Sequence, residues 1–290
     1  ALADQRFSLL YIVLQGFTVW NVQVGWLLER WQRDAGSHAR SWLVVLGEIE
    51  ALAALATLQH DNPSWTMPEI AADTNTCVSA SQLAHPLIAP DVAVPNDVAV
   101  GPEGTFLLIT GSNMSGKSTL MRALGLNVVL AQAGGPVCAT ALRLPPLTLA
   151  TSMRISDSLE GGISYFMAEL LRLKTILDIA EHSHANGRTT LFLLDEILHG
   201  TNTSERQIAA RQIIKHLLRF DAIGAVSTHD LTLAAAPDIA ATSQPFYFTE
   251  QFSRGPDGPV MDFDYTLRPG LAPSTNALKL MEIIGLPTED

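Results

Sequence analysis

The chain has 290 residues, of which 47% are apolar and 16% are charged. This is enough apolar material for the core of one large domain, or of one domain with an appendage, and it excludes an intrinsically disordered chain. The formal net charge of −11 excludes a general basic coat for nucleic acid, because such binding depends on Lys and Arg neutralising phosphates. The two cysteines, Cys77 and Cys138, are too few for a disulfide framework or a zinc site, and they favour a reducing, cytoplasmic compartment.

The first part of the chain is predicted to be helical. Residues 9–28 carry no charge, and apolar residues recur there at steps of three or four, which places them on one stripe of a helix. A membrane span needs about 20 apolar residues, and polar side chains interrupt this stretch, so a soluble helix that packs on a partner is favoured over a membrane-facing segment. A second helix is predicted over 40–58. Because the chain begins with Ala1 and shows no cleavable leader, we expect a piece of a longer protein.

The composition changes after the second helix. Five prolines within 62–97 break helices and favour extended segments or turns. From residue 98 onward, short apolar runs alternate with amphipathic helical stretches, a pattern typical of an α/β domain with a mainly parallel sheet. We therefore predict a small helical segment over 1–61, a linker and lead-in over 62–97, and an α/β domain over 98–290.

Within the predicted α/β domain, strands and helices alternate. Strands are predicted at 105–110, 147–155, 190–195, 222–228, 245–250 and 260–267. Helices are predicted at 116–133, 164–185, 204–220 and about 274–284. This alternation favours a sheet of parallel strands with helices as the connections between them.

The strongest motif, GSNMSGKST, fits the pattern G-x-x-x-x-G-K-[ST]. It follows an apolar strand and opens a helix, the context that a phosphate-binding loop requires, so a chance glycine-rich turn is the weaker alternative. Glycines let backbone N–H groups surround phosphate oxygens, and the helix N-terminus adds positive potential. Lys117 is expected to pair with the β- and γ-phosphates of ATP, and the Ser118 hydroxyl to enter the Mg²⁺ shell. The predicted nucleotide-binding residues are Gly111, Ser112, Asn113, Met114, Ser115, Gly116, Lys117, Ser118 and Thr119.

Polar residues end the next two predicted core strands. Asp195 and Glu196 follow an apolar run, and in a P-loop enzyme the first acid holds the water shell of Mg²⁺ while the second is placed to act as general base on the attacking water. His229 follows the next apolar run, and its imidazole can donate one hydrogen bond and accept another, as a sensor of the γ-phosphate or its water. A solvated turn and a surface histidine are the alternatives. Lys117, Glu196 and His229 are thus the predicted catalytic residues.

Four sequence runs together resemble the ATPase domain of the MutS family: GSNMSGKST at 111–119, RISDSLEGGISYFMAE at 154–169, LDEILHGTN at 194–202 and STH at 227–229. The resemblance extends over about 42–287, with His85 and Asn96 in the lead-in and Tyr265 in the closing segment. It implies a P-loop ATPase domain of the ABC type that binds ATP and Mg²⁺ and acts as a homodimer with composite sites. In that arrangement Ser164, with Gly162 nearby, caps the γ-phosphate bound to the partner subunit.

The resemblance also assigns the loop that holds Asn202 to the dimer interface, and it matches Gln132, more weakly, to a metal-contacting glutamine. The alternative for Ser164, at the start of a helix, is an N-cap, a role worth about 1 kcal/mol, and both roles can hold together. Ser112 stands where mismatch-repair members usually have Pro, and Ile163 where they usually have Arg. We therefore expect a MutS-like paralogue, coupled to DNA repair or DNA-structure processing through regions outside this chain.

Two other functions are compatible with these residues. The first is a nucleotide-driven motor of a membrane-associated, ABC-transporter-like assembly; the charge-free start favours it, and the DEI-x-x-GT run and the lack of an L-S-G-G-Q motif oppose it. The second is a scaffold that binds ATP without turnover. Strong autonomous DNA binding is not expected, because lysines are scarce and binding by this chain would be weak and strongly salt dependent.

Overall fold

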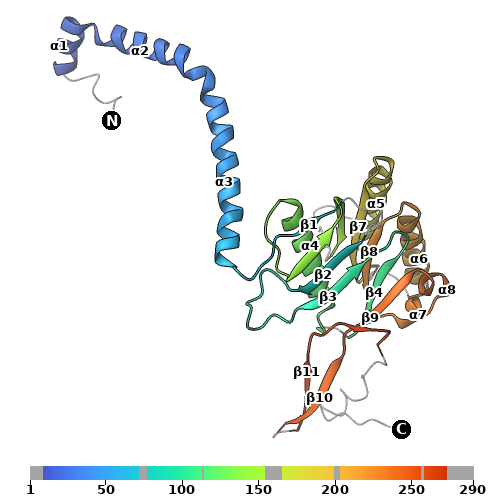
Figure 1. The fold of residues 1–290 in the computed structure, drawn as a ribbon. Coiled ribbons are helices and arrows are strands. Elements are labelled where there is room, and N and C mark those ends of the chain that lie inside the picture. The colour runs from blue at the N-terminus through green and yellow to red at the C-terminus, as the bar shows by residue number, and fades with distance from the viewer. Residues whose placement is uncertain are drawn as a thin grey trace, which may run out of the picture. The chain divides into compact units, whose positions relative to one another are not determined.

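The computed structural model describes residues 9–71, 77–112, 114–153, 165–198, 203–255 and 258–272 (Figure 1). The chain forms two compact units, Ala1–Thr57 and Leu58–Asp290. The mixed α/β class and the helical N-terminal segment are both confirmed. The predicted helix at 274–284 lies outside the described residues.

The first unit is built from helices: α1 (Leu9–Thr18), α2 (Trp20–Asp34), a 3₁₀ turn η2 (Gly36–His38) and α3 (Ala39–Asp61), which continues into the second unit. The single helical stripe predicted to start at residue 9 is broken at Val19, whose φ of 51° is left-handed. Two of the polar residues in the apolar stretch bridge this break. Gln15 Oε1 accepts from the Asn21 N–H at 3.0 Å, and Gln23 Nε2 donates to the Thr18 carbonyl at 2.7 Å.

One of the described helical stretches, Gly36–Asp61, is long and apolar enough to cross a membrane by length and composition alone, and its apolar window is not buried. This is not the stretch 9–28, which forms two shorter helices. Glu48 and Glu50 lie inside the apolar stretch. A carboxylate at the centre of a bilayer costs about 3 kcal/mol, so these two glutamates oppose a membrane-spanning role for this helix.

A six-stranded sheet forms the centre of the second unit, with the strand order β12-β9-β4-β8-β7-β6. All neighbours in it pair in parallel except β12 with β9. The strands are β4 (Phe106–Thr110), β6 (Leu147–Ser152), β7 (Thr189–Asp195), β8 (Ile223–Thr228), β9 (Ser243–Tyr247) and β12 (Arg268–Pro269). The helices are α4 (Lys117–Gln132), α5 (Tyr165–Ala185), α6 (Thr203–Arg219), α7 (Leu231–Ala234) and α8 (Pro237–Ala240).

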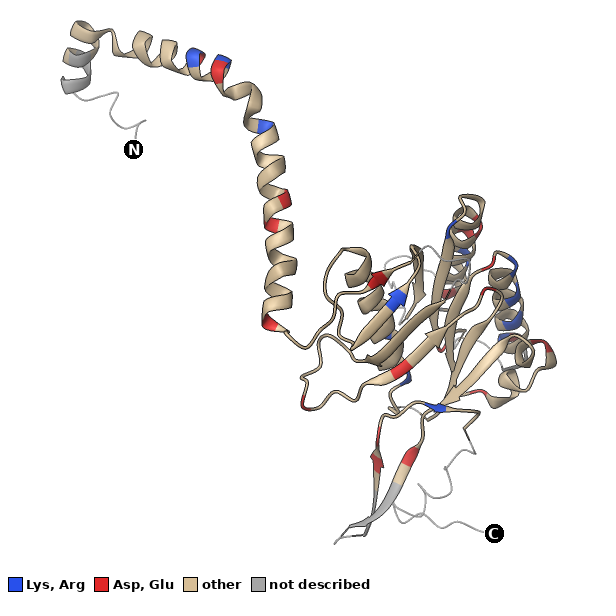
Figure 2. Ribbon diagram, in the orientation of Figure 1, with Lys and Arg blue, Asp and Glu red and all other residues tan. Residues whose placement is uncertain are grey.

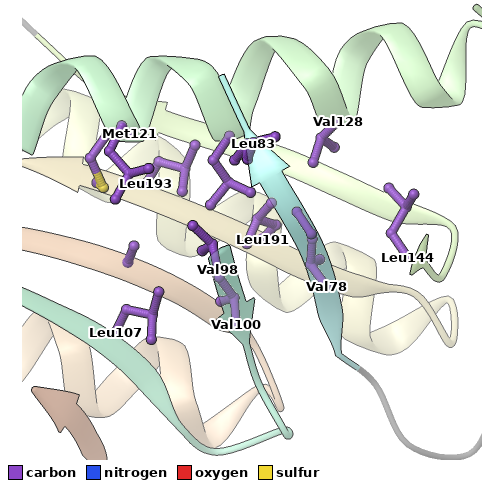
Figure 3. Packing of buried hydrophobic residues seen from close by; sticks show 14 of the residues in the cluster. Val78, Leu83, Val98, Val100, Leu107, Met121, Val128, Leu144, Leu191 and Leu193 are labelled. Carbon is purple, nitrogen blue, oxygen red and sulfur yellow. The ribbon is translucent and has the colours of Figure 1, made fainter. Parts of the chain in front are cut away.

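The two faces of this sheet have separate cores, because successive side chains of a strand point to opposite faces. On β4, Leu107 and Ile109 pack with α4, whereas Phe106 and Leu108 pack with α5 to α8. Figure 3 shows the first core, in which side chains of α4, β7 and a second, smaller sheet point into one layer. The central strands β4, β7 and β8 are buried along almost their whole length because both faces are covered.

The smaller sheet has the order β1-β5-β2-β3, and it corrects the prediction for 62–97. Its strands are β1 (Glu69–Ile70), β2 (Val78–Leu83), β3 (Asn96–Val100) and β5 (Ala141–Leu144). The segment predicted as a linker and lead-in thus supplies strands to the same compact unit, which begins at Leu58 rather than at residue 98. Local sequence missed these strands because β2 is stabilised by pairing with β5, about 60 residues away.

A hairpin follows β9, formed by β10 (Glu250–Gly255) and β11 (Gly258–Phe263). The predicted strand at 245–250 is therefore divided between β9 and β10. The remaining strand and helix predictions in the described part of 98–269 match observed elements to within a few residues at each end. The polar residues that end β4, β7 and β8 lie at one edge of the six-stranded sheet.

Close packing inside the sheet generates a stability prediction at Gly224 on β8. A Cβ at this position would lie 2.3 Å from the Phe192 carbonyl oxygen and 2.4 Å from its ring. Gly224→Ala should lower the free energy of unfolding by about 2 kcal/mol, the usual cost of overpacking. Urea unfolding followed by circular dichroism measures this change.

The matched control is Gly47→Ala in α3, where a Cβ has nothing within 4 Å. Alanine is the better helix former, so this variant should be neutral or slightly stabilising. An unfolding midpoint for Gly224→Ala equal to that of the wild type would contradict the close approach of β7 and β8.

Candidate active site

Three of the sequence motifs meet where the parallel strands β4, β8 and β7 end. In the observed register Thr110 pairs with Thr228, and Asp195 pairs with Ser227. The carboxyl ends of these neighbouring strands therefore lie side by side, which is the usual place for ligand binding in an open α/β sheet. The loop after β4, the acids that end β7 and the histidine after β8 all extend from this edge.

The loop between β4 and α4 needs glycine at both ends. The φ of Gly111 is 142° and that of Gly116 is 110°. A Cβ on Gly111 would lie 2.7 Å from the Phe248 carbonyl oxygen, so a side chain does not fit there. The Ser115 hydroxyl is buried and has no hydrogen-bond partner among the described residues. A tight loop backbone and a buried hydroxyl donor suit a polyphosphate, because phosphate oxygens accept hydrogen bonds from backbone N–H and hydroxyl groups.

Lys117 is buried at the first position of α4, with 4% of its side chain exposed. Its Nζ donates to the carbonyl oxygens of Gly111, at 2.9 Å, and Ser112, at 2.7 Å. Burial lowers the pKa of Lys117, while the charges of Glu196 and Asp195 act in the opposite direction. The loop thus holds an ammonium group next to its own backbone, where a β- or γ-phosphate oxygen would lie.

Ser227, for which the sequence suggested no role, organises both acids at the end of β7. Its Oγ donates to Asp195 Oδ1 at 2.5 Å. The Glu196 N–H is directed at the same Oγ, at 3.1 Å, and at the Ser227 carbonyl oxygen, at 3.2 Å. Ser227 is fully buried, so these bonds are shielded from water. Only the register of β7 against β8 shows that this serine faces Asp195.

The three predicted catalytic side chains lie together. Glu196 Oε1 is 3.5 Å from Lys117 Nζ and 3.8 Å from His229 Nδ1. Glu196 has a left-handed φ of 49°, which turns its side chain out of the strand direction. It is 26% exposed and His229 is 45% exposed, so solvent reaches the carboxylate and the imidazole, while the ammonium is buried.

Ser112 donates through Oγ to Glu250 Oε2 at 3.0 Å. Glu250 is the first residue of the β10–β11 hairpin. This hydrogen bond connects the loop after β4 to the hairpin.

Other predicted residues lie at this edge or outside the described chain. Ser118 and Thr119 are in the first turn of α4, directly after Lys117. Asn113, Gly162, Ser164 and Asn202 lie outside the described residues, and their roles stay predictions.

Gln132 does not reach this edge. It is the last residue of α4, 15 residues after Lys117, which corresponds to about 22 Å along a helix. Its Oε1 accepts from the Leu147 N–H at 2.8 Å and so supports the start of β6. The match of Gln132 to a metal contact is therefore wrong.

A mainly apolar pocket with a volume of about 330 Å³ adjoins the loop. It lies between the lead-in segment, the start of α4 and the residues after β11, and its lining includes His85, Val94, Gly116, Leu120, Phe248 and Tyr265. Burial, with a smaller contribution from Arg122, lowers the pKa of His85, which favours the neutral imidazole. The pocket is suited to a flat, weakly polar ring attached to a polyphosphate in the loop.

The backbone around Tyr265, which lines this pocket, is held by hydrogen bonds with Asn96. Its carbonyl oxygen accepts from Asn96 Nδ2 at 3.0 Å, and Asn96 Oδ1 accepts from the Leu267 N–H at 2.7 Å. Asp264 anchors the same turn through Arg268, whose hydrogen bond, opposed by burial, holds the pKa of Asp264 at about 2. From the sequence, Asn96 and Tyr265 belong to segments that resemble the family, but neither has an assigned role. They lie 169 residues apart, so only the folded chain shows that they are in contact.

The oxygen ligands fit a magnesium ion shared with a nucleotide. Among the described residues, no group of three or more His, Cys, Asp and Glu side chains could hold a metal ion. Mg²⁺ is commonly bound through one or two protein oxygens together with waters and substrate phosphates. The Ser118 hydroxyl and the Asp195 carboxylate, at the edge of the loop, are a donor set of that kind.

Known proteins resemble this chain in sequence over most of its length. The family MutS domain V matches residues 107–289. The DNA mismatch repair protein MutS 2 of Halobacterium salinarum is 33% identical, over 88% of this chain and 28% of the relative. DNA mismatch repair protein MutS of Natronomonas pharaonis is 34% identical, over 83% and 27%. DNA mismatch repair protein MSH6 of Arabidopsis thaliana is 30% identical, over 86% and 20%. The chain thus spans only about a quarter of the length of these relatives.

Proposed function

This chain belongs to the MutS family, and we propose that it binds ATP with Mg²⁺ and hydrolyses it at the edge formed by β4, β8 and β7. The observation that supports this most directly is the position of Glu196 between Lys117 and His229, within 3.8 Å of each. A phosphate-binding cation and a residue that acts on or positions the attacking water are recurring parts of sites for phosphoryl transfer to water.

Each residue at this edge has a role in the proposed reaction. The loop backbone and the Lys117 ammonium bind the β- and γ-phosphates. Ser118 and Asp195 hold Mg²⁺, which neutralises phosphate charge when bound. Ser227 keeps the Asp195 carboxylate in one orientation through its hydroxyl.

Glu196 acts as the general base. A γ-phosphate that pairs with Lys117 competes with Glu196 for the ammonium, so the carboxylate becomes available to a water molecule. Glu196 takes a proton as the water oxygen attacks the γ-phosphorus, the bond to the β,γ-bridging oxygen breaks, and ADP and phosphate are released. His229, beside the same carboxylate oxygen, orients the water or the γ-phosphate.

The apolar pocket next to the loop accommodates the base of the nucleotide in this proposal. Gly116 belongs to both the loop and the pocket lining, so a ligand can occupy the two together. The ring of Tyr265, whose backbone carbonyl is held by Asn96, offers a stacking surface for the base.

We further propose that two copies of the chain pair through their nucleotide sites. Family resemblance supports this arrangement: Ser164 and Gly162 would contact the γ-phosphate of the partner subunit, and Asn202 would lie in the interface loop. ATP would then complete the contact between the two subunits.

DNA repair or DNA-structure processing is the proposed biological setting, because the relatives are named as mismatch repair proteins. Figure 2 shows Lys and Arg residues along α6, but several of them are neutralised by acids. Arg211 and Lys215 each lie 2.8 Å from Asp238, and Arg206 lies 3.3 Å from Asp230. We therefore propose that DNA is engaged through regions outside this chain, in the cytoplasm. The comparisons do not favour the transporter-like alternative.

The first prediction tests the general base. Glu196→Gln should retain ATP binding and lower the hydrolysis rate by about 10²- to 10⁴-fold, the usual range for loss of a positioned base. Phosphate release and nucleotide binding measured on the same samples give both quantities. Glu181→Gln, an exposed glutamate on α5, is the control and should match the wild type. ATP binding without turnover in the wild type would support the scaffold alternative instead.

The second prediction concerns the base pocket. Tyr265→Ala should weaken ATP binding about tenfold, because stacking on an aromatic ring contributes roughly 1–3 kcal/mol per base. Tyr265→Phe keeps the ring and should bind as the wild type does. Equilibrium titration with a fluorescent ATP analogue measures the affinities. Equal affinities for the alanine and phenylalanine variants would remove the ring from base binding.

The third prediction addresses the composite sites. Ser164→Arg and Lys117→Ala proteins should each be inactive alone, and their mixture should regain activity, because one site of each mixed dimer combines an intact loop with an intact Ser164. ATP hydrolysis measured against mixing ratio follows the gain. A mixture with no more activity than its components would argue against contacts between subunits at the site.

A further inference from the structure

A buried carboxylate on α5 holds the loop that follows the proposed general base. Glu169 is only 3% exposed. Its Oε1 accepts from the backbone N–H of Leu198 at 2.5 Å, two residues beyond Glu196. The bond joins α5 to the loop after β7, across 29 residues of sequence.

The loop held by Glu169 has an unusual backbone. Glu196 has a φ of 49° and Leu198 a φ of 65°, both in the left-handed region that residues other than glycine rarely adopt. Such conformations persist only where surrounding contacts determine them, and they concentrate at functional sites. The backbone conformation at Glu196 therefore depends on the contacts made by the residues before and after it.

Different elements hold the two sides. Before the loop, Ser227 on β8 accepts from the Glu196 N–H. After it, the Leu198 N–H donates to Glu169, and the buried side chain of Leu198 packs in the same core as Leu173 and Ile176 of α5. The general base thus lies between an anchor in the sheet and an anchor in α5.

The choice of a carboxylate at this position is costly. Removing a carboxyl group from water is unfavourable unless hydrogen bonds compensate for it. The Leu198 N–H supplies one such bond, and without the Glu169 oxygen this N–H of a fully buried residue would lose that acceptor. Glu169 therefore restrains the Leu198 backbone.

We propose that Glu169 is a positioning residue for ATP hydrolysis, which acts by fixing the 196–198 backbone and thereby the carboxylate of Glu196. This inference rests on the proposed function of the site. It makes the orientation of the general base depend on the position of α5, so that a displacement of α5 changes the rate of the chemical step and leaves nucleotide binding in the loop intact.

The test compares Glu169→Leu, which removes the acceptor, with Glu169→Gln, which keeps a neutral acceptor oxygen. Glu169→Leu should lower kcat for ATP about 10²-fold, as expected when a reacting group is displaced by about 1 Å. The KM for ATP should change less than about twofold, and Glu169→Gln should have an intermediate kcat. Glu181→Leu, on the exposed side of the same helix, is the control and should retain the wild-type kcat.

A second measurement separates positioning from general damage to the fold. Each Glu169 substitution is combined with Glu196→Gln, and single-turnover hydrolysis is measured. If Glu169 acts through Glu196, its loss should have almost no further effect in that background, because residues that act as a unit are not additive. If Glu169→Leu does not fold, as a thermal melt would show, the Glu169→Gln pair provides the same comparison.

The outcomes distinguish this inference from the proposed function. A wild-type chain that does not hydrolyse ATP contradicts the proposed function. If the wild type is active but Glu169→Leu has a normal kcat, only the positioning role is overturned. The same holds if Glu169→Leu lowers the hydrolysis rate by the same factor in the wild type and in the Glu196→Gln background. A large rise in the KM for ATP at unchanged kcat would also overturn it.

Discussion

The parallel register of β4, β8 and β7 is the constraint on which the candidate site depends. Each strand carries a polar residue or loop at its carboxyl end, and pairing in register brings those ends to one edge. A shift by one residue would exchange the two faces of a strand and destroy both cores. The same packing that buries Leu107 and Phe106 on opposite faces therefore also determines where Lys117, Glu196 and His229 meet.

Several polar groups at this edge have partners from neighbouring elements. Lys117 lies against backbone carbonyls and a carboxylate, Asp195 against Ser227, and the Leu198 N–H against Glu169. Buried charges and donors are tolerated when such partners are present and are costly without them. The site is thus a connected network in which the orientation of Glu196 depends on contacts from the sheet, α4 and α5.

The residues assigned to the proposed chemistry were accessible to sequence reasoning, and their supporting residues were not. The loop at 111–119, Asp195, Glu196 and His229 each follow an apolar run, so a local pattern shows both the residue and its place at a strand end. Ser227, Glu169 and the Asn96–Tyr265 pair act through contacts across 29 to 169 residues of sequence. Gln132 is the opposite case. The sequence suggested a role in the site, but in the structure this residue lies too far along α4 to reach it.

By itself the sequence determined the alternation of strands and helices, the class of the fold and the motif residues, because these depend on local periodicity and on short spacings. The tertiary structure alone decided that 62–97 joins the main unit through β2, that the helical stripe breaks at Val19, and that a pocket forms beside the phosphate loop. It also decided which buried groups hold Glu196. The physical reason is that strand pairing, burial and hydrogen bonding between distant segments depend on three-dimensional proximity, which a local pattern does not encode.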